Sequence, residues 1–102
     1  MYKFILLYGQ PKDPEAFDKY YQQIHIPMAS KMRGLQVVVG KIFATSEDEP
    51  CPFYQSAELI ADSRASIEAA LNSEDGKAAV KDIANFADGG VTTFWLECKD
   101  PA

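Results

Sequence analysis

Apolar residues occupy both odd and even positions at the start of the chain, from Tyr2 to Tyr8. This pattern is typical of a β-strand with two buried faces, and Gly9-Gln10-Pro11 ends it because proline cannot donate to a strand ladder. A helix is predicted next, since Asp13 is a favoured N-cap residue and Pro14 is favoured at the first helical position. Apolar residues at helical spacing predict its buried face: Phe17, Tyr20, Tyr21, Ile24 and Met28.

Pro27 interrupts this helical pattern. Proline lacks a backbone N–H and disfavours helical geometry in the preceding residue, so we expect a kink or break at Ile26. A short helical turn is predicted to resume from Pro27 to about Met32, with Gly34 as its C-cap.

Three more strands and a divided helix are predicted in the rest of the chain. The second strand contains Gly40, which we interpret as a bulge or a point of close approach. The second helix begins after Asp62-Ser63 and is interrupted at Asn72-Ser73. The order β-α-β-β-α-β is that of a ferredoxin-like α+β fold, with helices on one face of a four-stranded antiparallel sheet. The predicted strands are residues 35–44, 53–61 and 91–98.

The face of this sheet without helices is also predicted to be apolar. Ile5 and Leu7 alternate with the other apolar residues of the first strand, and Phe94 and Leu96 alternate with Trp95 in the last. Large apolar patches are rarely left exposed on a monomer, so we expect a second copy to cover this face in a homodimer with a barrel-like interior. The alternative is that loops and the short C-terminal tail cover it.

Composition supports one ordinary globular domain over residues 1–102. Apolar residues make up 47% and charged residues 25% of the 102 residues, and the net charge is −5. An acidic chain is a poor candidate for nucleic-acid binding. The longest apolar run, Phe4 to Tyr8, is too short to cross a membrane, and no signal-peptide cleavage site follows it. We therefore expect a soluble, cytoplasmic protein.

The sequence indicates no metal site and no resident cofactor. Cys51 and Cys98 form no C-x-x-C pair and are interpreted as free thiols, and one histidine excludes a histidine-rich metal site. The acidic cluster Glu47-Asp48-Glu49 is interpreted as a solvated loop. No dinucleotide, P-loop or flavin fingerprint is present.

Three sequence blocks resemble the EthD-like proteins, the ethyl tert-butyl ether degradation type within the dimeric α+β barrel superfamily. The blocks are Tyr8-Gly9-Gln10-Pro11-x-Asp13-Pro14, Phe17-x-x-Tyr20-Tyr21-x-x-x-His25-x-Pro27-Met28 with Gly34-Leu35, and Asn85-Phe86-Ala87-Asp88-Gly89-Gly90-Val91-Thr92. The sequence departs from the pattern at Arg33, where proline is expected, and at Glu74-Asp75-Gly76.

This resemblance implies a homodimer with a cavity on the inner face of each sheet. It does not define a reaction: members are commonly labelled oxidoreductases, whereas relatives in the superfamily include cyclases, isomerases, haem-degrading monooxygenases and peroxidases. Fold analogy cannot choose among these chemistries.

His25 and Tyr21 are the candidate catalytic residues. His25 is the only histidine, so any proton transfer by an imidazole near neutral pH depends on it. In the alternative interpretation, His25 donates to a backbone carbonyl freed by the break at Pro27 and stabilises that break. Tyr21 lies one turn earlier on the same side of the helix, where its phenol could contact a ligand oxygen; Tyr20 is a second such candidate.

Four further residues are candidates for ligand contact. Tyr8, Phe4 and Trp95 are predicted to form core or cavity wall. Glu58 lies in the middle of a strand, where a carboxylate needs a partner, and an ion pair across the dimer is an equal alternative. The absence of a basic rim in an acidic chain disfavours heavily anionic ligands.

Two classes of function follow. The chain is either a small enzyme that transforms a small apolar organic compound, with His25 as acid or base, or a non-catalytic binding or accessory protein for a partner oxygenase. Haem, with His25 as its axial ligand, is a third and weaker option.

Overall fold

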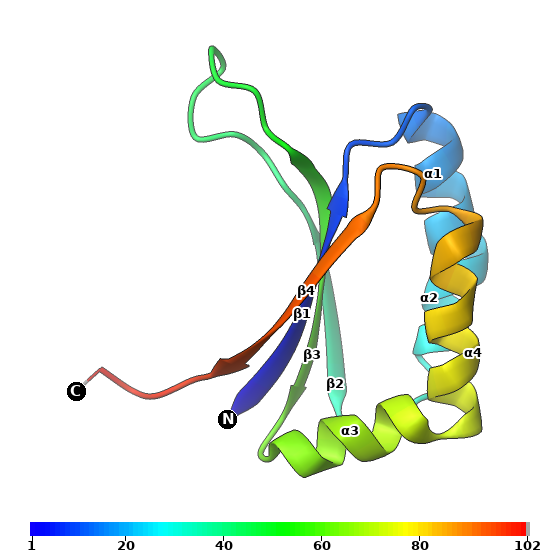
Figure 1. The fold of residues 1–102 in the computed structure, drawn as a ribbon, viewed down its shortest axis with the longest axis vertical. Helices are drawn as coiled ribbons and strands as arrows, with labels where there is room; N and C mark the ends of the chain where they lie inside the picture. The colour runs from blue at the N-terminus through cyan, green and yellow to red at the C-terminus, as the bar shows by residue number, and fades with distance from the viewer. Residues whose placement is uncertain (102) are drawn as a thin grey trace.

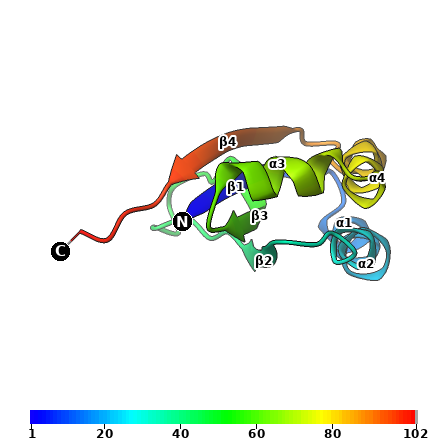
Figure 2. The same ribbon diagram turned by 90° about the horizontal axis from the view of Figure 1, so that it is seen from below.

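The computed structural model describes residues 1–101 and contains one four-stranded sheet with helices against one face (Figure 1). Every neighbouring pair of strands is antiparallel, in the order β2-β3-β1-β4, as the ferredoxin-like prediction requires. Figure 2 shows the sheet and the helical layer from one end, with α3 lying across that end. The elements are β1 (Tyr2–Gly9), α1 (Pro14–Tyr20), the π-helix η1 (Tyr21–His25), α2 (Ile26–Ala29), β2 (Gln36–Lys41), β3 (Phe53–Ala61), α3 (Arg64–Asn72), α4 (Glu74–Asp82), the 3-10 helix η2 (Ile83–Asn85) and β4 (Val91–Glu97).

The first helical segment begins as predicted but does not break at Ile26. Asp13 caps α1 by accepting a hydrogen bond from the backbone N–H of Ala16. Ile26 keeps helical backbone angles, and its N–H donates to the carbonyl of Tyr21, five residues earlier. This π-turn adds a residue before Pro27, which then lies in the first turn of α2, where its missing N–H is tolerated. The discontinuity therefore precedes Pro27 and includes His25.

The second helix is divided at Ser73, as predicted. The Ser73 backbone N–H ends α3 by donating to Ala70, and its side chain caps α4 by accepting from the N–H of Gly76. A Cβ at Gly76 would lie 2.0 Å from the carbonyl oxygen of Ala70, so only glycine fits this corner. The corner turns α4 back along the sheet.

Gly40 is neither a bulge nor a point of close approach. β2 and β3 pair there without a register shift, and a Cβ at Gly40 would make only an ordinary contact, 3.5 Å from Oγ of Ser56. The irregularity lies in β1 between Tyr8 and Gly9. A Cβ on Gly9 would lie 2.1 Å from the carbonyl oxygen of Gly89, so the two backbones meet at a place where no side chain fits. The second strand is also shorter than predicted, ending at Lys41.

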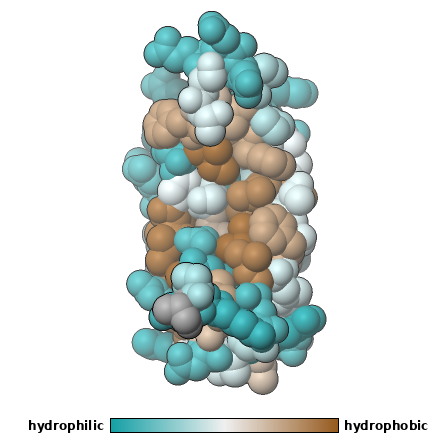
Figure 3. All heavy atoms as spheres, turned by 90° about the vertical axis from the view of Figure 1, so that its left-hand side faces the viewer, coloured by the Kyte–Doolittle hydropathy of each residue, from teal (hydrophilic) through white to brown (hydrophobic). Residues whose placement is uncertain are grey.

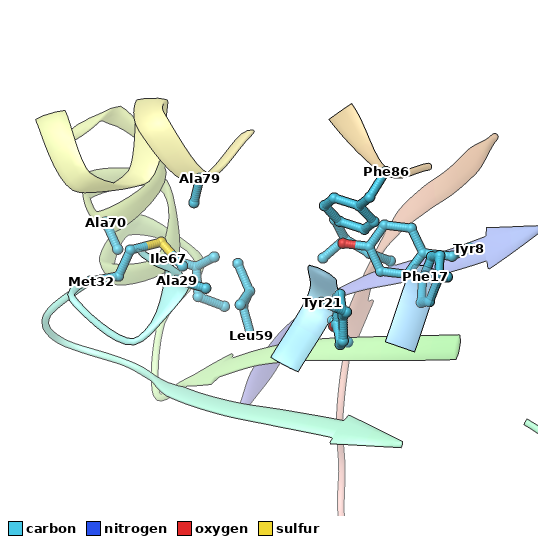
Figure 4. Packing of buried hydrophobic residues seen from close by; sticks show 12 residues of the cluster. Tyr8, Phe17, Tyr21, Ala29, Met32, Leu59, Ile67, Ala70, Ala79 and Phe86 are labelled. Carbon is cyan, nitrogen blue, oxygen red and sulfur yellow. The ribbon is translucent and has the colours of Figure 1, made fainter. Parts of the chain in front are cut away.

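The core between sheet and helices contains an aromatic and an aliphatic group (Figure 4). Tyr8 and Ile67 are the most completely buried large residues, at 1% and 0% exposure. Phe17, Tyr21 and Phe86 surround Tyr8, with ring centroids 5.4–5.9 Å from it. The aliphatic group lies under α3, α4 and the end of α2.

The opposite face of the sheet carries no helix, and hydrophobic side chains gather over its middle (Figure 3). Phe94 and Leu96 are 39% and 40% exposed there. Lys3 and Glu58 form an ion pair of 3.1 Å between neighbouring strands on this face. No helix within residues 1–101 is long and apolar enough to cross a membrane.

Candidate functional site

A small cavity lies between the sheet and the helices. Its volume is about 40 Å³, and its walls come mainly from β1, β2 and β3 on one side and from η1, α2 and α4 on the other. Almost all of these residues are apolar; the exceptions are Tyr8, Tyr21 and His25. The cavity thus lies on the helix-covered face of the sheet, and not on the helix-free face that a second copy is expected to cover.

His25 is held in place by a buried carboxylate from α4. Its Nδ1 lies 2.9 Å from Oδ2 of Asp82, and both side chains are 6% exposed. Asp82 also accepts hydrogen bonds from the Tyr20 hydroxyl at 2.6 Å and from the Asn85 amide at 3.0 Å. These bonds join η1 and the end of α1 to α4. The partner of His25 is therefore a side chain, and not the backbone carbonyl considered from the sequence.

The hydrogen bonds to Asp82 determine which imidazole nitrogen carries the proton. Burial acts to raise the pKa of Asp82, but the bonds from Tyr20, Asn85 and His25 outweigh it and hold the pKa below its usual value. Asp82 is therefore ionised at neutral pH and can only accept hydrogen bonds. The Nδ1 atom of His25 must donate to it, and in the neutral imidazole Nε2 is left with the free lone pair.

This lone pair is available to a ligand. Within residues 1–101, every fully buried side-chain nitrogen or oxygen has a hydrogen-bond partner, whereas no protein group bonds to Nε2. Nε2 is therefore open to a water-sized molecule, although His25 as a whole is only 5% exposed and lines the cavity. A basic imidazole nitrogen without a protein partner can accept or return a proton when a ligand reaches it.

Aromatic rings fix the plane of the imidazole. Tyr21 stacks on His25 with ring centroids 5.5 Å apart, and Phe86 lies 4.6 Å away at a tilted angle. Burial raises the pKa of Tyr21 and of Tyr8, and hydrogen bonding to Asp82 raises that of Tyr20. All three phenols are neutral near pH 7 and can act only as hydrogen-bonding groups.

The structure brings together most of the residues predicted from the sequence, but not all. Phe4, Tyr8, Tyr21 and His25 line the cavity, whereas Tyr20 reaches His25 only through Asp82.

Two candidates lie elsewhere. Trp95 packs on Phe4, at a ring distance of 4.8 Å, and lies under the guanidinium of Arg64. Glu58 lies on the helix-free face and pairs with Lys3 of its own chain. Neither residue lines the cavity.

Sequence reasoning did not find Asp82, Asn85 or Phe86 as parts of the site. A signal for Asp82 exists: it lies three residues after Ala79 and four before Phe86, on the buried side of the helix. A carboxylate in that position requires a partner.

Residues 1–101 contain no cluster of three histidine, cysteine or acidic side chains that could hold a metal ion. The two cysteines are free thiols, as predicted, and neither lines the cavity.

Comparison with known proteins agrees with this architecture. The EthD domain family model matches residues 9–90. The chain is 35% identical to an ethyl tert-butyl ether degradation (EthD) family protein of Bacillus halodurans, whose structure it matches with a TM-score of 0.88 over 97% of this chain and 99% of that one. It is 32% identical to an uncharacterized 11.0 kDa protein of the thcB–thcC intergenic region of Rhodococcus erythropolis, over 95% of this chain and 94% of that one.

A dimeric ferredoxin-like protein of unknown function from Thermobifida fusca shares the fold at 11% identity, with a TM-score of 0.70 over 95% of this chain and 90% of that one. The family model covers most of the chain, and the EthD structure is similar in both sequence and fold. The chain belongs to the EthD domain family.

Proposed function

We propose that the chain binds a small apolar organic compound beside His25 and that Nε2 of His25 exchanges a proton with it. One observation carries the proposal: a buried imidazole whose Nδ1 is held by a carboxylate and whose Nε2 has no protein partner at the edge of an apolar cavity.

The residues around His25 suit this role. Asp82 fixes the tautomer and would stabilise the imidazolium that forms when Nε2 takes up a proton. The apolar walls would exclude water from the reacting atoms. A volume of about 40 Å³ holds only a few waters, so a ligand must enlarge the cavity by moving side chains.

The proposal includes a homodimer that buries the helix-free faces of two sheets. It is supported by the hydrophobic surface in Figure 3 and by structural neighbours described as dimeric. In Figure 1, the β2–β3 connection and the C-terminal segment both lean toward this side. Phe43, at the start of that connection, is 84% exposed and would be covered by a partner.

The second candidate is a non-catalytic binding or accessory protein. The bonds from Asp82 to Tyr20 and His25 also join two helices, which is what a purely structural network would do. An oxidoreductase role would need a cofactor or partner enzyme from outside this chain. A porphyrin is a wide, rigid plane that moving a few side chains of a 40 Å³ cavity would not admit, unlike a slender alkyl chain, so we do not propose haem as the ligand.

Replacing His25 separates the two candidates. Binding is measured with 1-octanol, and proton transfer is measured as deuterium exchange from solvent into small apolar ketones. His25→Ala should lower this exchange by ~10²–10⁴-fold, and His25→Asn should restore it only partly. Gln23→Ala, an exposed position in the same helix, is the control. Binding without exchange in the wild type would favour the accessory role, and unchanged exchange in both His25 variants would disprove the acid–base role.

A further inference from the structure

A wide groove between α4 and β4 adjoins the cavity. Its volume is about 800 Å³, and it shares five apolar wall residues with the cavity: Phe4, Leu6, Leu71, Val80 and Ile83. Val80 and Val91, which also line the groove, are 51% and 40% exposed. An apolar molecule in the groove therefore lies directly against the wall of the cavity.

The rim of this groove is basic. Lys77 and Lys81 lie one turn apart on α4 and line the groove, whereas no carboxylate does. Neither lysine forms an ion pair within residues 1–101, although the chain has 15 acidic residues and 10 basic ones. Like charges at this helical spacing repel each other, so an anion between them would relieve the repulsion. The sequence predicted no basic rim around a ligand site, and this prediction is wrong for the α4–β4 groove.

On the opposite side, a smaller groove of about 200 Å³ adjoins the cavity and shares the walls Tyr21, Ile26 and Val39 with it, but polar contacts cross this groove. Lys41 of β2 donates to Asp18 of α1 and, at 2.6 Å, to the hydroxyl of Tyr54, which itself donates to Asp18 at 2.8 Å. These contacts join the sheet to the first helix beside Tyr21. Within residues 1–101, no side-chain hydrogen bond or ion pair crosses the α4–β4 groove, which is the larger of the two.

We propose that the ligand is an amphiphilic carboxylic acid, with its apolar part directed along the groove into the cavity and its carboxylate between Lys77 and Lys81. This inference rests on the proposed function and specifies its ligand class. The proposal requires both the shared apolar wall and the unpaired lysines. The apolar wall alone would suit a neutral ligand equally well, and the lysines alone would suit a fully polar anion.

The test compares octanoate with 1-octanol, which differ in charge but not in chain length. Calorimetry at low ionic strength should show octanoate binding about two- to tenfold more tightly, as expected for two exposed ionic contacts. Lys77→Gln and Lys81→Gln should each lower octanoate affinity and leave octanol affinity unchanged, while Lys19→Gln, an exposed lysine outside the groove, changes neither. Salt should remove the preference.

The His25 imidazole resonances report whether the ligand reaches the cavity. A shift on octanoate binding supports the proposed path. Equal affinity for the two compounds, with no effect of the lysine variants, would overturn the inference and leave the cavity proposal standing. If neither compound binds or shifts His25, both proposals fail.

Discussion

Replacing Asp82 by asparagine should reverse the tautomer of His25. The carboxylate of Asp82 accepts from Nδ1 of His25 at 2.9 Å and thereby places the imidazole proton on Nδ1. An asparagine amide of nearly the same shape can donate from its nitrogen, and its oxygen can still accept from Tyr20, which lies 2.6 Å from the other carboxylate oxygen. Nδ1 of His25 would then accept, and the proton would move to Nε2, the nitrogen without a protein partner.

The effect on stability should be much smaller for asparagine than for alanine. Asp82→Ala removes an acceptor from three donors, of which the His25 ring is almost completely buried. Breaking a buried charged pair in this way typically destabilises a protein by about 3–5 kcal/mol. For Asp82→Asn we expect the free energy of unfolding to fall by roughly 1–2 kcal/mol, because the hydrogen bonds are weakened but still made. At about 4–8 °C per kcal/mol, this loss lowers Tm by about 4–16 °C.

Nitrogen chemical shifts test this prediction directly, because His25 is the only histidine in the chain. The wild type should show the Nδ1–H form at high pH, and Asp82→Asn should show the Nε2–H form. Proton-transfer activity should fall in Asp82→Asn, because an Nε2 that already carries the proton cannot accept one. Octanol binding should be unchanged. The same tautomer in both proteins would refute the role given to Asp82.

The pH dependence of stability gives an independent check on the same pair of proteins. The pKa of Asp82 in the folded protein lies below its ordinary value of about 3.9. Its stabilising contribution is therefore present above about pH 4 and is lost as the pH falls below that value. Urea unfolding midpoints between pH 6 and 3 should fall more steeply for the wild type than for Asp82→Asn. Parallel curves would show that Asp82 is not preferentially ionised in the folded state.

Two further predictions concern the dimer and the π-turn. Phe94→Asp should convert the protein to a folded monomer in light scattering, because it places a charge on the helix-free face, whereas Ile24→Asp on the helical surface should not. A wild-type mass of 11.3 kDa across dilution would refute the dimer itself. Pro27→Ala supplies a backbone N–H, and we expect the π-turn to revert to α-helix and move the His25 ring away from Asp82. An unchanged backbone and ring position in crystals of this variant would contradict that coupling.

The sequence was sufficient to predict the fold because its strongest signals are local. Asp13-Pro14 predicted the start of α1, and Ser73 was correctly placed at the division of the second helix. The π-turn could not be predicted in this way. Pro27 shows only that one backbone hydrogen bond is missing. A break of the helix at Ile26 and a residue inserted before Ile26 are both compatible with the sequence. Packing of the helix on the sheet selects between these two.

The site was only partly predictable because its central contact joins residues that are 57 positions apart. His25 could be identified as the only imidazole, but its partner could not be read from its own helix. The partner could nevertheless have been found in the same way as that of Glu58. A carboxylate in an apolar strand needs a cation, and the structure supplies Lys3 from the neighbouring strand. Asp82 satisfies the same condition on a helix, and its closest basic partner is His25. A buried carboxylate is therefore as informative a signal for this site as the histidine that it holds.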